Sequence, residues 1–329
     1  MLKINALAAA VVAAAGLAGA AHATNKTTAP APAPTPTKGV VLVTTNLQYQ
    51  NAAAAGTGIV LTKTGEILTN NHVIRGATTI KVTVPSTKRT YTADVLGYDI
   101  SDDIALIKLA GATNLATATR ADSSKLKIGD LSTAVGNANG GGRLVITRGK
   151  VIGLDRSITV NDDEGGTANL SGLIQTSARL VPGDSGGPLL DAKGRVIGVD
   201  AAGSSSSAFR PSGYAIPINK AISLVHQIEA GTATSLVHIG KTAFLGVTPE
   251  DTPNGVTIES VLDGLPAAAA GLDRGFVITA IDDQQIPTVD NLRAAIFAHH
   301  PGDVVTIAYV DALGNAGTAS ITFADGPPQ

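Results

Sequence analysis

The chain has no cysteine and no tryptophan, and it has few aromatic residues of any kind. The lack of cysteine excludes disulfides, thiolate metal sites and a cysteine nucleophile. Aromatic residues make up only 3% of the 329 residues, so the core must be built mainly from Ala, Val, Ile and Leu. Hydrophobic residues nevertheless reach 44%, which argues against a disordered chain. We therefore expect a folded protein, and its length is typical of about two domains.

The chain also lacks a strong net charge and, beyond its N-terminal segment, any long apolar run. The formal net charge is −2. Binding to the phosphates of nucleic acids needs clustered Lys and Arg, so no nucleic-acid partner is expected. No stretch after residue 23 is long and apolar enough to span a bilayer, so we expect no stable transmembrane anchor.

The first 23 residues have the layout of a secretory signal peptide. Lys3 precedes an apolar run over residues 6–20, and Ala21, His22 and Ala23 then form a small-x-small cleavage site. A retained membrane anchor is the alternative, but the run is shorter than the roughly 20 residues that a spanning helix needs. We expect cleavage after Ala23 and export to a secreted, periplasmic or cell-envelope location.

The rest of the chain divides into a linker and two folded regions. Residues 24–38 alternate proline with small residues, which predicts an extended linker. Residues 39–230 show short apolar runs between turn residues, the pattern of an all-β barrel or sandwich. They end in a predicted helix capped by Asn219 and stopped by Gly231. Residues 231–240 are predicted to be a hinge, and residues 241–326 a second domain with several strands and two helices.

The strongest local signal is the sequence VPGDSGGPL over residues 181–189. A serine hydroxyl needs a base to accept its proton and backbone N–H groups that face the developing oxyanion. Glycines beside the serine permit the tight backbone that presents those donors. Ser185 is therefore the predicted nucleophile, and the amides of Gly183 and Ser185 form the predicted oxyanion hole. An ordinary glycine-rich turn is the alternative, which so many specified residues in a row disfavour.

A base and an acid must accompany this serine. Of the six histidines, His72 lies where a predicted strand gives way to a turn, and we select it as the base. The acid must orient the imidazole and stabilise its cation. Asp99 and Asp102 are also present, but Asp103 leads directly into an apolar strand. Spacing alone leaves the choice between Asp102 and Asp103 open.

Residues 69–74, 103–106 and 183–188 resemble the three catalytic blocks of trypsin-like HtrA/DegP serine proteases. The order of His72, Asp103 and Ser185 and their spacing are also similar to that family. The resemblance places the catalytic aspartate immediately before Ile-Ala-Leu, which selects Asp103. It implies a mainly β fold in which two six-stranded barrels enclose the triad, with no metal and no cofactor. It also suggests a homo-oligomer, with a trimer as the family's common state, although the sequence leaves the oligomeric state open.

The second domain resembles a PDZ domain in residues 244–247, 264–272 and 301–305. The resemblance implies an α+β fold, a small and partly open β-barrel with two helices, that binds C-terminal peptides by strand addition. The peptide carboxylate is expected to lie at the loop formed by Phe244, Leu245, Gly246 and Val247. A small β domain with a closed groove is the alternative.

One departure from the family concerns the oxyanion loop, and two further features concern specificity. Asp184 stands where the family usually has Asn, which bears on how the oxyanion loop is held but removes no catalytic group. Arg179 lies near the expected base of the specificity pocket, where it would either favour an acidic P1 residue or point to solvent. By the resemblance, Ala201, Ala202 and Gly203 form the pocket wall. These residues are small, which predicts a small or medium aliphatic P1 residue.

The two resemblances together imply an endopeptidase that cleaves unfolded or misfolded proteins and whose activity a PDZ domain regulates. Two other functions are alternatives to this one. Residues 183–187 also fit the G-x-S-x-G motif of α/β-hydrolases. That fold needs a helix after the serine and the order Ser, Asp, His, which Pro188 and the positions of His72 and Asp103 oppose. The second alternative is a chaperone or peptide-binding protein on a protease scaffold. All three triad positions are filled, which argues against it.

Overall fold

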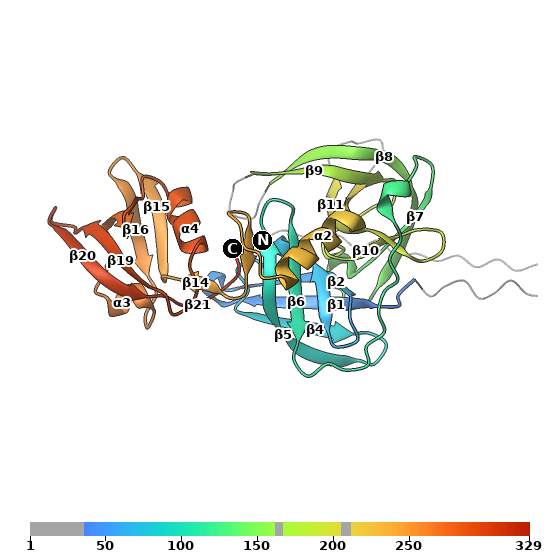
Figure 1. The fold of residues 1–329 in the computed structure, drawn as a ribbon, viewed down its shortest axis with the longest axis horizontal. Coiled ribbons are helices and arrows are strands. Elements are labelled where there is room, and N and C mark those ends of the chain that lie inside the picture. The colour runs from blue at the N-terminus through green and yellow to red at the C-terminus, as the bar shows by residue number, and fades with distance from the viewer. Residues whose placement is uncertain (1–35, 162–166, 205–211) are drawn as a thin grey trace, which may run out of the picture. The chain divides into compact units, whose positions relative to one another are not determined.

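The computed structural model describes residues 36–161, 167–204 and 212–329, so the predicted signal peptide and most of the linker lie outside the described residues. Within those ranges, no helix combines the length and the apolar character needed to cross a membrane. Figure 1 shows the chain as β-rich, with short helices beside the sheets.

The first barrel is built from the first six strands, blue to teal in Figure 1. Their order is β5-β4-β1-β2-β3-β6, and pairing of β5 with β6 closes the ring. The strands are β1 (Val40–Leu47), β2 (Ala52–Val60), β3 (Glu66–Thr69), β4 (Thr79–Val84), β5 (Arg89–Asp99) and β6 (Ile104–Leu109). The one-turn helix α1 (Asn71–Ile74) follows β3 directly.

The second barrel closes in the order β10-β11-β12-β9-β8-β7. Its strands are β7 (Leu131–Gly136), β8 (Val145–Asn161), β9 (Thr167–Thr176), β10 (Pro188–Leu190), β11 (Val196–Ser204) and β12 (Ser212–Pro217). The predicted pair of six-stranded barrels is confirmed. Residues 181–187 of the nucleophile motif lie between β9 and β10, and Pro188 and Leu189 begin β10.

Continuous apolar runs in the first barrel arise because its strands are buried on both faces. Successive residues of a strand point to opposite faces. Val41, Ile67 and Ile107 therefore fill the first barrel, whereas their neighbours Val40, Leu68 and Leu106 pack with residues of the second barrel. That shared core contains Val135, Leu190 and Val199 of the second barrel. The two barrels are thus held together by a common apolar core.

Helix α2 (Ile218–Glu229) joins the same shared core through Ala221, Val225 and Ile228. The predicted Asn219 cap is wrong, because the helix already begins at Ile218. The Asn219 amide instead donates to Asp122 Oδ1 at 2.8 Å. Gly231, with φ of 68°, follows the helix as predicted. Within the predicted hinge, β13 (Val237–Ile239) pairs with β5.

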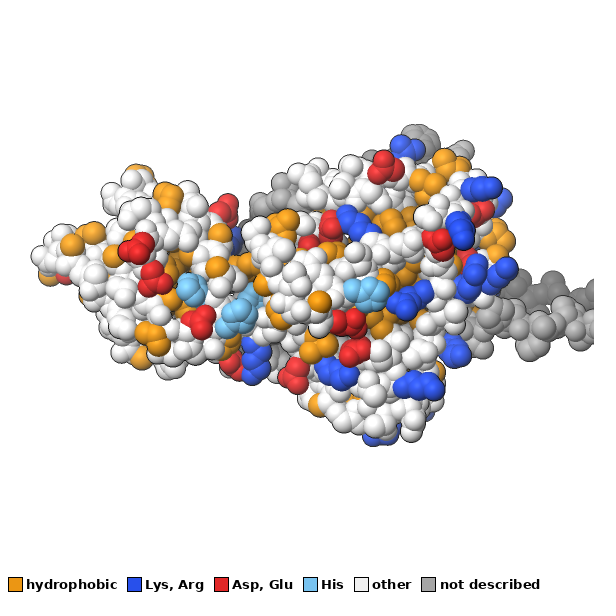
Figure 2. Space-filling model, in the orientation of Figure 1, with side chains coloured by type: hydrophobic (Ala, Val, Ile, Leu, Met, Phe, Trp, Pro, Cys, Tyr) orange, Lys and Arg blue, Asp and Glu red, His pale blue; other side chains and the backbone are white. Residues whose placement is uncertain are grey.

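The C-terminal region has the predicted strands and two helices. Strands β14 (Thr242–Phe244) and β21 (Ala324–Gly326) form one small sheet. The other sheet contains β15 (Val247–Thr252), β16 (Gly255–Val261), β17 (Val277–Ile281), β18 (Gln284–Gln285), β19 (Val304–Val310) and β20 (Ala316–Thr322). Helices α3 (Pro266–Ala269) and α4 (Val289–Phe297) contribute Ala267, Leu292 and Ala295 to its separate core. On the face in Figure 2, acidic and basic side chains are mixed over the described surface.

Candidate active site

The imidazole of His72 is oriented by a single carboxylate. His72 lies in α1, and its Nδ1 is 2.7 Å from Oδ2 of Asp103, the residue immediately before β6. The backbone N–H of His72 donates to the other carboxylate oxygen, Oδ1, at 2.9 Å. Asn70 Nδ2 in turn donates to the Asp103 carbonyl at 2.8 Å. With Nδ1–H donated to Asp103, the basic nitrogen of a neutral His72 is Nε2, as a general base requires.

The three candidate carboxylates have three different partners in the structure. Asp99 Oδ1 accepts hydrogen bonds from the turn that follows it, at Ser101 and the Asp102 amide. Asp102 Oδ1 forms an ion pair with Lys220 Nζ at 2.6 Å. Of these three carboxylates, that of Asp103 is the one that hydrogen-bonds to His72. Asp103 has a φ of 54°, a left-handed conformation that aspartate tolerates better than most residues.

The loop that carries Ser185 is fixed through its carbonyl groups. Asn139 N–H donates to the Pro182 carbonyl at 2.6 Å, and Gly187 N–H donates to that of Asp184 at 2.9 Å. The carbonyls of Gly183 and Ser185 are likewise hydrogen-bonded, to groups of one residue in β2. By contrast, within the described chain the amides of Gly183 and Ser185 donate no hydrogen bond. Two such amides are what an oxyanion hole requires.

Glycine is required at two positions of this loop. Gly183 has a φ of 94°, and a Cβ there would lie 2.2 Å from the Asn137 carbonyl oxygen. Gly186 has a φ of 81°, and its Cβ would lie 2.2 Å from the Thr57 carbonyl oxygen. Both contacts are with backbone atoms, so no side chain can move away to make room. This explains physically why the motif needs these glycines.

The strand after the motif lies beside the serine. Ser185 Oγ donates to the Ala201 carbonyl at 3.3 Å, which places β11 next to the predicted nucleophile. Ala202 and Gly203 continue this strand, paired with Tyr214 and Gly213, and the side chain of Ala202 lies outside the described part of the structure. Arg179 is exposed, while Ala178 and Leu180 on either side of it are buried. Its role in P1 preference stays a prediction.

Two buried carboxylates interact near the nucleophile, that of Asp184 in the serine loop and that of Asp200 in β11. The sequence analysis did not predict that these two residues form a pair. Asp200 in β11 is completely buried, and neither carboxylate oxygen has a hydrogen-bond partner. Burial, followed by repulsion from Asp184, raises the pKa of Asp200 well above its ordinary value. Burial also raises the pKa of Asp184, although its Oδ2 accepts the Val181 N–H at 3.0 Å. Asp200 is therefore expected to keep a proton in the folded protein.

A proton held by Asp200 in the folded protein makes the free energy of unfolding depend on pH. Unfolding releases Asp200 to a pKa of about 3.9, so the folded state binds more protons above that pH. The Asp200 contribution is complete at low pH and decreases as pH rises from about 4 through the raised folded pKa. The stability of Asp200→Asn relative to wild type should therefore be higher at pH 8 than at pH 4, by about 1–3 kcal/mol.

Urea denaturation at both pH values measures this difference. Asp283→Asn, which changes an exposed aspartate, provides the matched control and should follow wild type at both pH values. The same stability difference between Asp200→Asn and wild type at pH 4 and pH 8 would contradict a protonated Asp200.

The loop before β15 also presents amides without partners. The carbonyls of Leu245 and Gly246 accept hydrogen bonds from Ala267 and Leu262. The amides of Leu245 and Gly246 donate none within the described residues. Gly246 has a φ of 84°, and a Cβ there would lie 2.5 Å from Leu265 Cβ. A cavity of about 1000 Å³ includes this loop and residues of α4 in its lining.

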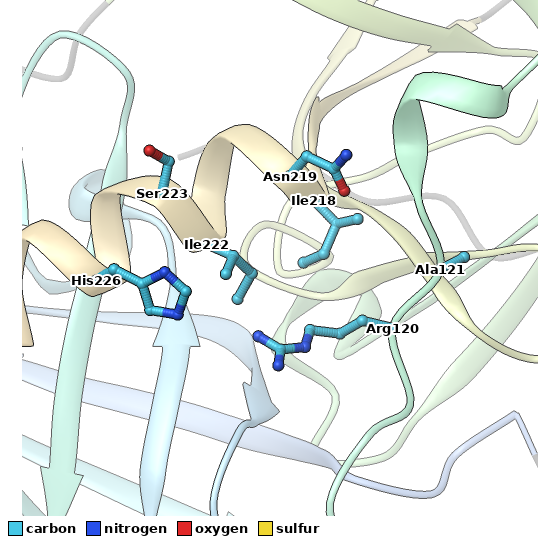
Figure 3. A pocket seen from close by; sticks show the side chains of 7 residues that line it. All are labelled: Arg120, Ala121, Ile218, Asn219, Ile222, Ser223 and His226. Atoms are coloured by element: carbon cyan, nitrogen blue, oxygen red, sulfur yellow. The ribbon is translucent and has the colours of Figure 1, made fainter.

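A smaller surface pocket of about 360 Å³ shares no residue with the triad or its loop. Figure 3 shows Arg120 and His226 extending toward one another beside Ile222 of α2. The side chains of Arg120 and His226 are both exposed. This pocket therefore contributes no group to the chemistry of Ser185.

Comparison with known proteins agrees with this geometry. Residues 56–199 match the family model for a trypsin-like peptidase domain, and residues 243–310 match that for a PDZ domain. The serine protease Do-like HtrA of Lactococcus lactis subsp. lactis is 32% identical over 278 residues, covering 78% of this chain and 67% of that protein. A probable periplasmic serine protease do/HhoA-like of Haemophilus influenzae is 34% identical over 276 residues, covering 79% and 56%.

Solved structures agree as well. The HtrA-type protease AlgW with a tripeptide has a TM-score of 0.53 and 28% identity, covering 89% of this chain and 95% of that one. The predicted resemblance is thus confirmed over both domains. The chain belongs to the HtrA/DegP family of serine endopeptidases, with a trypsin-like peptidase domain and a PDZ domain.

Proposed function

We propose that Ser185, His72 and Asp103 cleave peptide bonds of unfolded or misfolded polypeptides. The observation that carries this proposal is the two-point contact of Asp103 with His72, through Nδ1 at 2.7 Å and the backbone N–H at 2.9 Å. This contact leaves Nε2 as the nitrogen that accepts the proton of Ser185. The serine loop supports the same chemistry, because the amides of Gly183 and Ser185 have no acceptor among the described residues.

The reaction proceeds in two halves. Ser185 Oγ attacks the scissile carbonyl carbon and its proton passes to His72 Nε2. The amides of Gly183 and Ser185 donate to the oxyanion of the tetrahedral intermediate. His72 then protonates the leaving amine as the peptide bond breaks, which forms an acyl-enzyme. Water, deprotonated by His72, attacks the ester and releases the second product and Ser185. Asp103 stays ionised throughout and stabilises the imidazolium.

The PDZ domain is proposed to bind C-terminal peptides and to regulate cleavage. The amides of Leu245 and Gly246 are available for a carboxylate, and the adjoining strand β15 offers an edge for strand addition. The solved HtrA-type relative contains a tripeptide, which supports peptide binding by this family.

Export is proposed from the N-terminal pattern of Lys3, the apolar run and the Ala-His-Ala site. The relative from Haemophilus influenzae is named a probable periplasmic protease, which supports a location in or beyond the cell envelope. Mass spectrometry of the mature N-terminus tests this. A first residue other than Thr24 would contradict cleavage after Ala23.

A fluorophosphonate probe tests the nucleophile directly. Wild type should be labelled at Ser185, because this is the hydroxyl that the proposed mechanism activates through His72 and the amides of the serine loop. His72→Ala should react at least about a hundredfold more slowly, because general-base help contributes about 10²–10⁴-fold. Peptide mapping by mass spectrometry locates the label. If wild type cleaves no casein and takes up no probe, the non-catalytic peptide-binding alternative replaces this proposal.

Capture of a carboxylate predicts a clear difference between two peptides. A fluorescent peptide ending in a free carboxylate should bind at least about tenfold more tightly than the same peptide ending in an amide, because charge-assisted hydrogen bonds are lost. Fluorescence anisotropy measures both affinities. Gly246→Ala should weaken binding of the acid, since the new Cβ would overlap Leu265. Equal affinity for acid and amide would contradict the assigned loop.

A further inference from the structure

One buried threonine joins the serine loop to the first barrel. Thr57, in β2, is completely buried. Its backbone N–H donates to the Ser185 carbonyl at 2.9 Å, and its hydroxyl donates to the Gly183 carbonyl at 2.7 Å. The same hydroxyl accepts the Asn137 N–H at 2.9 Å. Its carbonyl accepts from Thr69 Oγ1 at 2.7 Å, in the strand that leads to α1.

Thr57 is the one described residue that donates hydrogen bonds to two carbonyls of the serine loop, those of Gly183 and Ser185. The four carbonyls from Pro182 to Ser185 are all hydrogen-bonded, and Thr57 supplies two of the four donors. Its hydroxyl is also the only side-chain donor among them, since the other three are backbone N–H groups. Thr57 thus links the segment before His72 with the peptide units that surround the oxyanion hole.

We propose that Thr57 is a positioning residue for the reaction, whose hydroxyl fixes the Gly183–Asp184 peptide so that the Gly183 and Ser185 amides converge on one oxyanion. This inference rests on the proposed function of Ser185. The Gly183 backbone already has a φ of 94°, where small rotations of a peptide redirect the neighbouring N–H. The hydroxyl bond opposes such rotation, and the Asn137 N–H donates to the same hydroxyl oxygen, which favours the orientation in which the hydroxyl proton points at the Gly183 carbonyl.

A positioning role differs from simple core packing in what it changes. Oxyanion donors act in the transition state, so their misplacement lowers kcat and leaves KM nearly unchanged. Loss of packing lowers stability without this selective effect on kcat. The γ-methyl of Thr57 lies near Gly187, where an added Cβ would come within 3.1 Å of it, and serine would lose this methyl while keeping the hydroxyl. The two roles can therefore be separated by substitution.

Three variants provide the test. Thr57→Val removes the hydroxyl and preserves shape, Thr57→Ala removes both hydroxyl and methyl, and Thr57→Ser keeps the hydroxyl alone. On an internally quenched peptide with a casein cleavage sequence, Thr57→Val and Thr57→Ala should lose roughly a hundredfold in kcat, the scale of one misplaced oxyanion donor. KM should stay within about threefold, and Thr57→Ser should keep kcat within about threefold.

Ser132→Ala is the matched control, because it removes another buried hydroxyl whose partner, Thr176, lies outside the serine loop. It should leave kcat unchanged. If Thr57→Val does not fold, the Ser and Ala variants still decide the matter. Full kcat in Thr57→Ala, or equal losses in Thr57→Ser and Thr57→Ala, would overturn the inference. Failure of the proposed function looks different, because wild type itself would then neither cleave the peptide nor react with fluorophosphonate.

Discussion

Replacing Ser185 with alanine should lower kcat on a peptide substrate by roughly a millionfold, the scale seen when other serine proteases lose their nucleophile. Without Oγ no acyl-enzyme can form, and His72 has no hydroxyl to deprotonate. The amides of Gly183 and Ser185 remain, so a residual rate of about 10³–10⁴ times the uncatalysed rate is expected. Digestion of unfolded casein, with fragments identified by mass spectrometry, measures the loss of activity. The sites that wild type cleaves define the P1 preference and test the role of Arg179.

Binding should separate from cleavage in this variant. Ser185→Ala removes one oxygen atom and no substrate-binding contact, so its affinity for casein should stay within about threefold of wild type. Ser223→Ala, which changes an exposed serine of α2, should keep full activity. Cleavage of casein by Ser185→Ala at the wild-type rate would show that another group, or another protein, is the nucleophile.

Replacing Asp103 with asparagine should lower kcat by about 10⁴-fold, as the same change does in other triads. Asp103 accepts two N–H groups, from the His72 backbone and from His72 Nδ1. Asparagine has one acceptor oxygen. If that oxygen serves the His72 backbone, the amide NH₂ faces Nδ1, which must then lose its proton. The imidazole proton moves to Nε2, and the nitrogen that faces Ser185 can no longer accept one.

Asp102→Asn is the matched control for this prediction, because Asp102 precedes Asp103 in the chain but pairs with Lys220. It should cost at most about 1 kcal/mol of stability, since the ion pair is partly exposed, and activity should stay within about twofold. Steady-state kinetics and melting temperatures of both variants make the comparison. Comparable losses of activity in the two variants would contradict the assignment of Asp103.

The motif around Ser185 could be predicted from sequence because its constraints are local. Gly183 and Gly186 need positive φ angles and have no space for a Cβ, so residues adjacent in the sequence specify the conformation of the loop. The apolar runs that become β-strands are local as well. The predicted cap at Asn219 failed for the opposite reason, because a tertiary partner, Asp122, takes its side chain.

The trimer suggested by the family resemblance and the predicted domain boundaries stay predictions. The role of Arg179 in specificity also stays a prediction, although its exposed side chain favours the solvent-facing alternative.

The serine motif, the strand-rich fold and the order of the two domains could be predicted from residue order alone, because each depends on residues close together in the chain. Spacing alone left Asp102 and Asp103 open and the family resemblance favoured Asp103, whereas the folded chain adds that the Asp103 carboxylate contacts His72 and that of Asp102 pairs with Lys220. The tertiary structure also revealed Thr57, whose hydroxyl reaches a carbonyl 126 residues away, and the buried carboxylate of Asp200. Hydrogen-bond partners and burial depend on how distant segments come together, and residue order along the chain does not specify them.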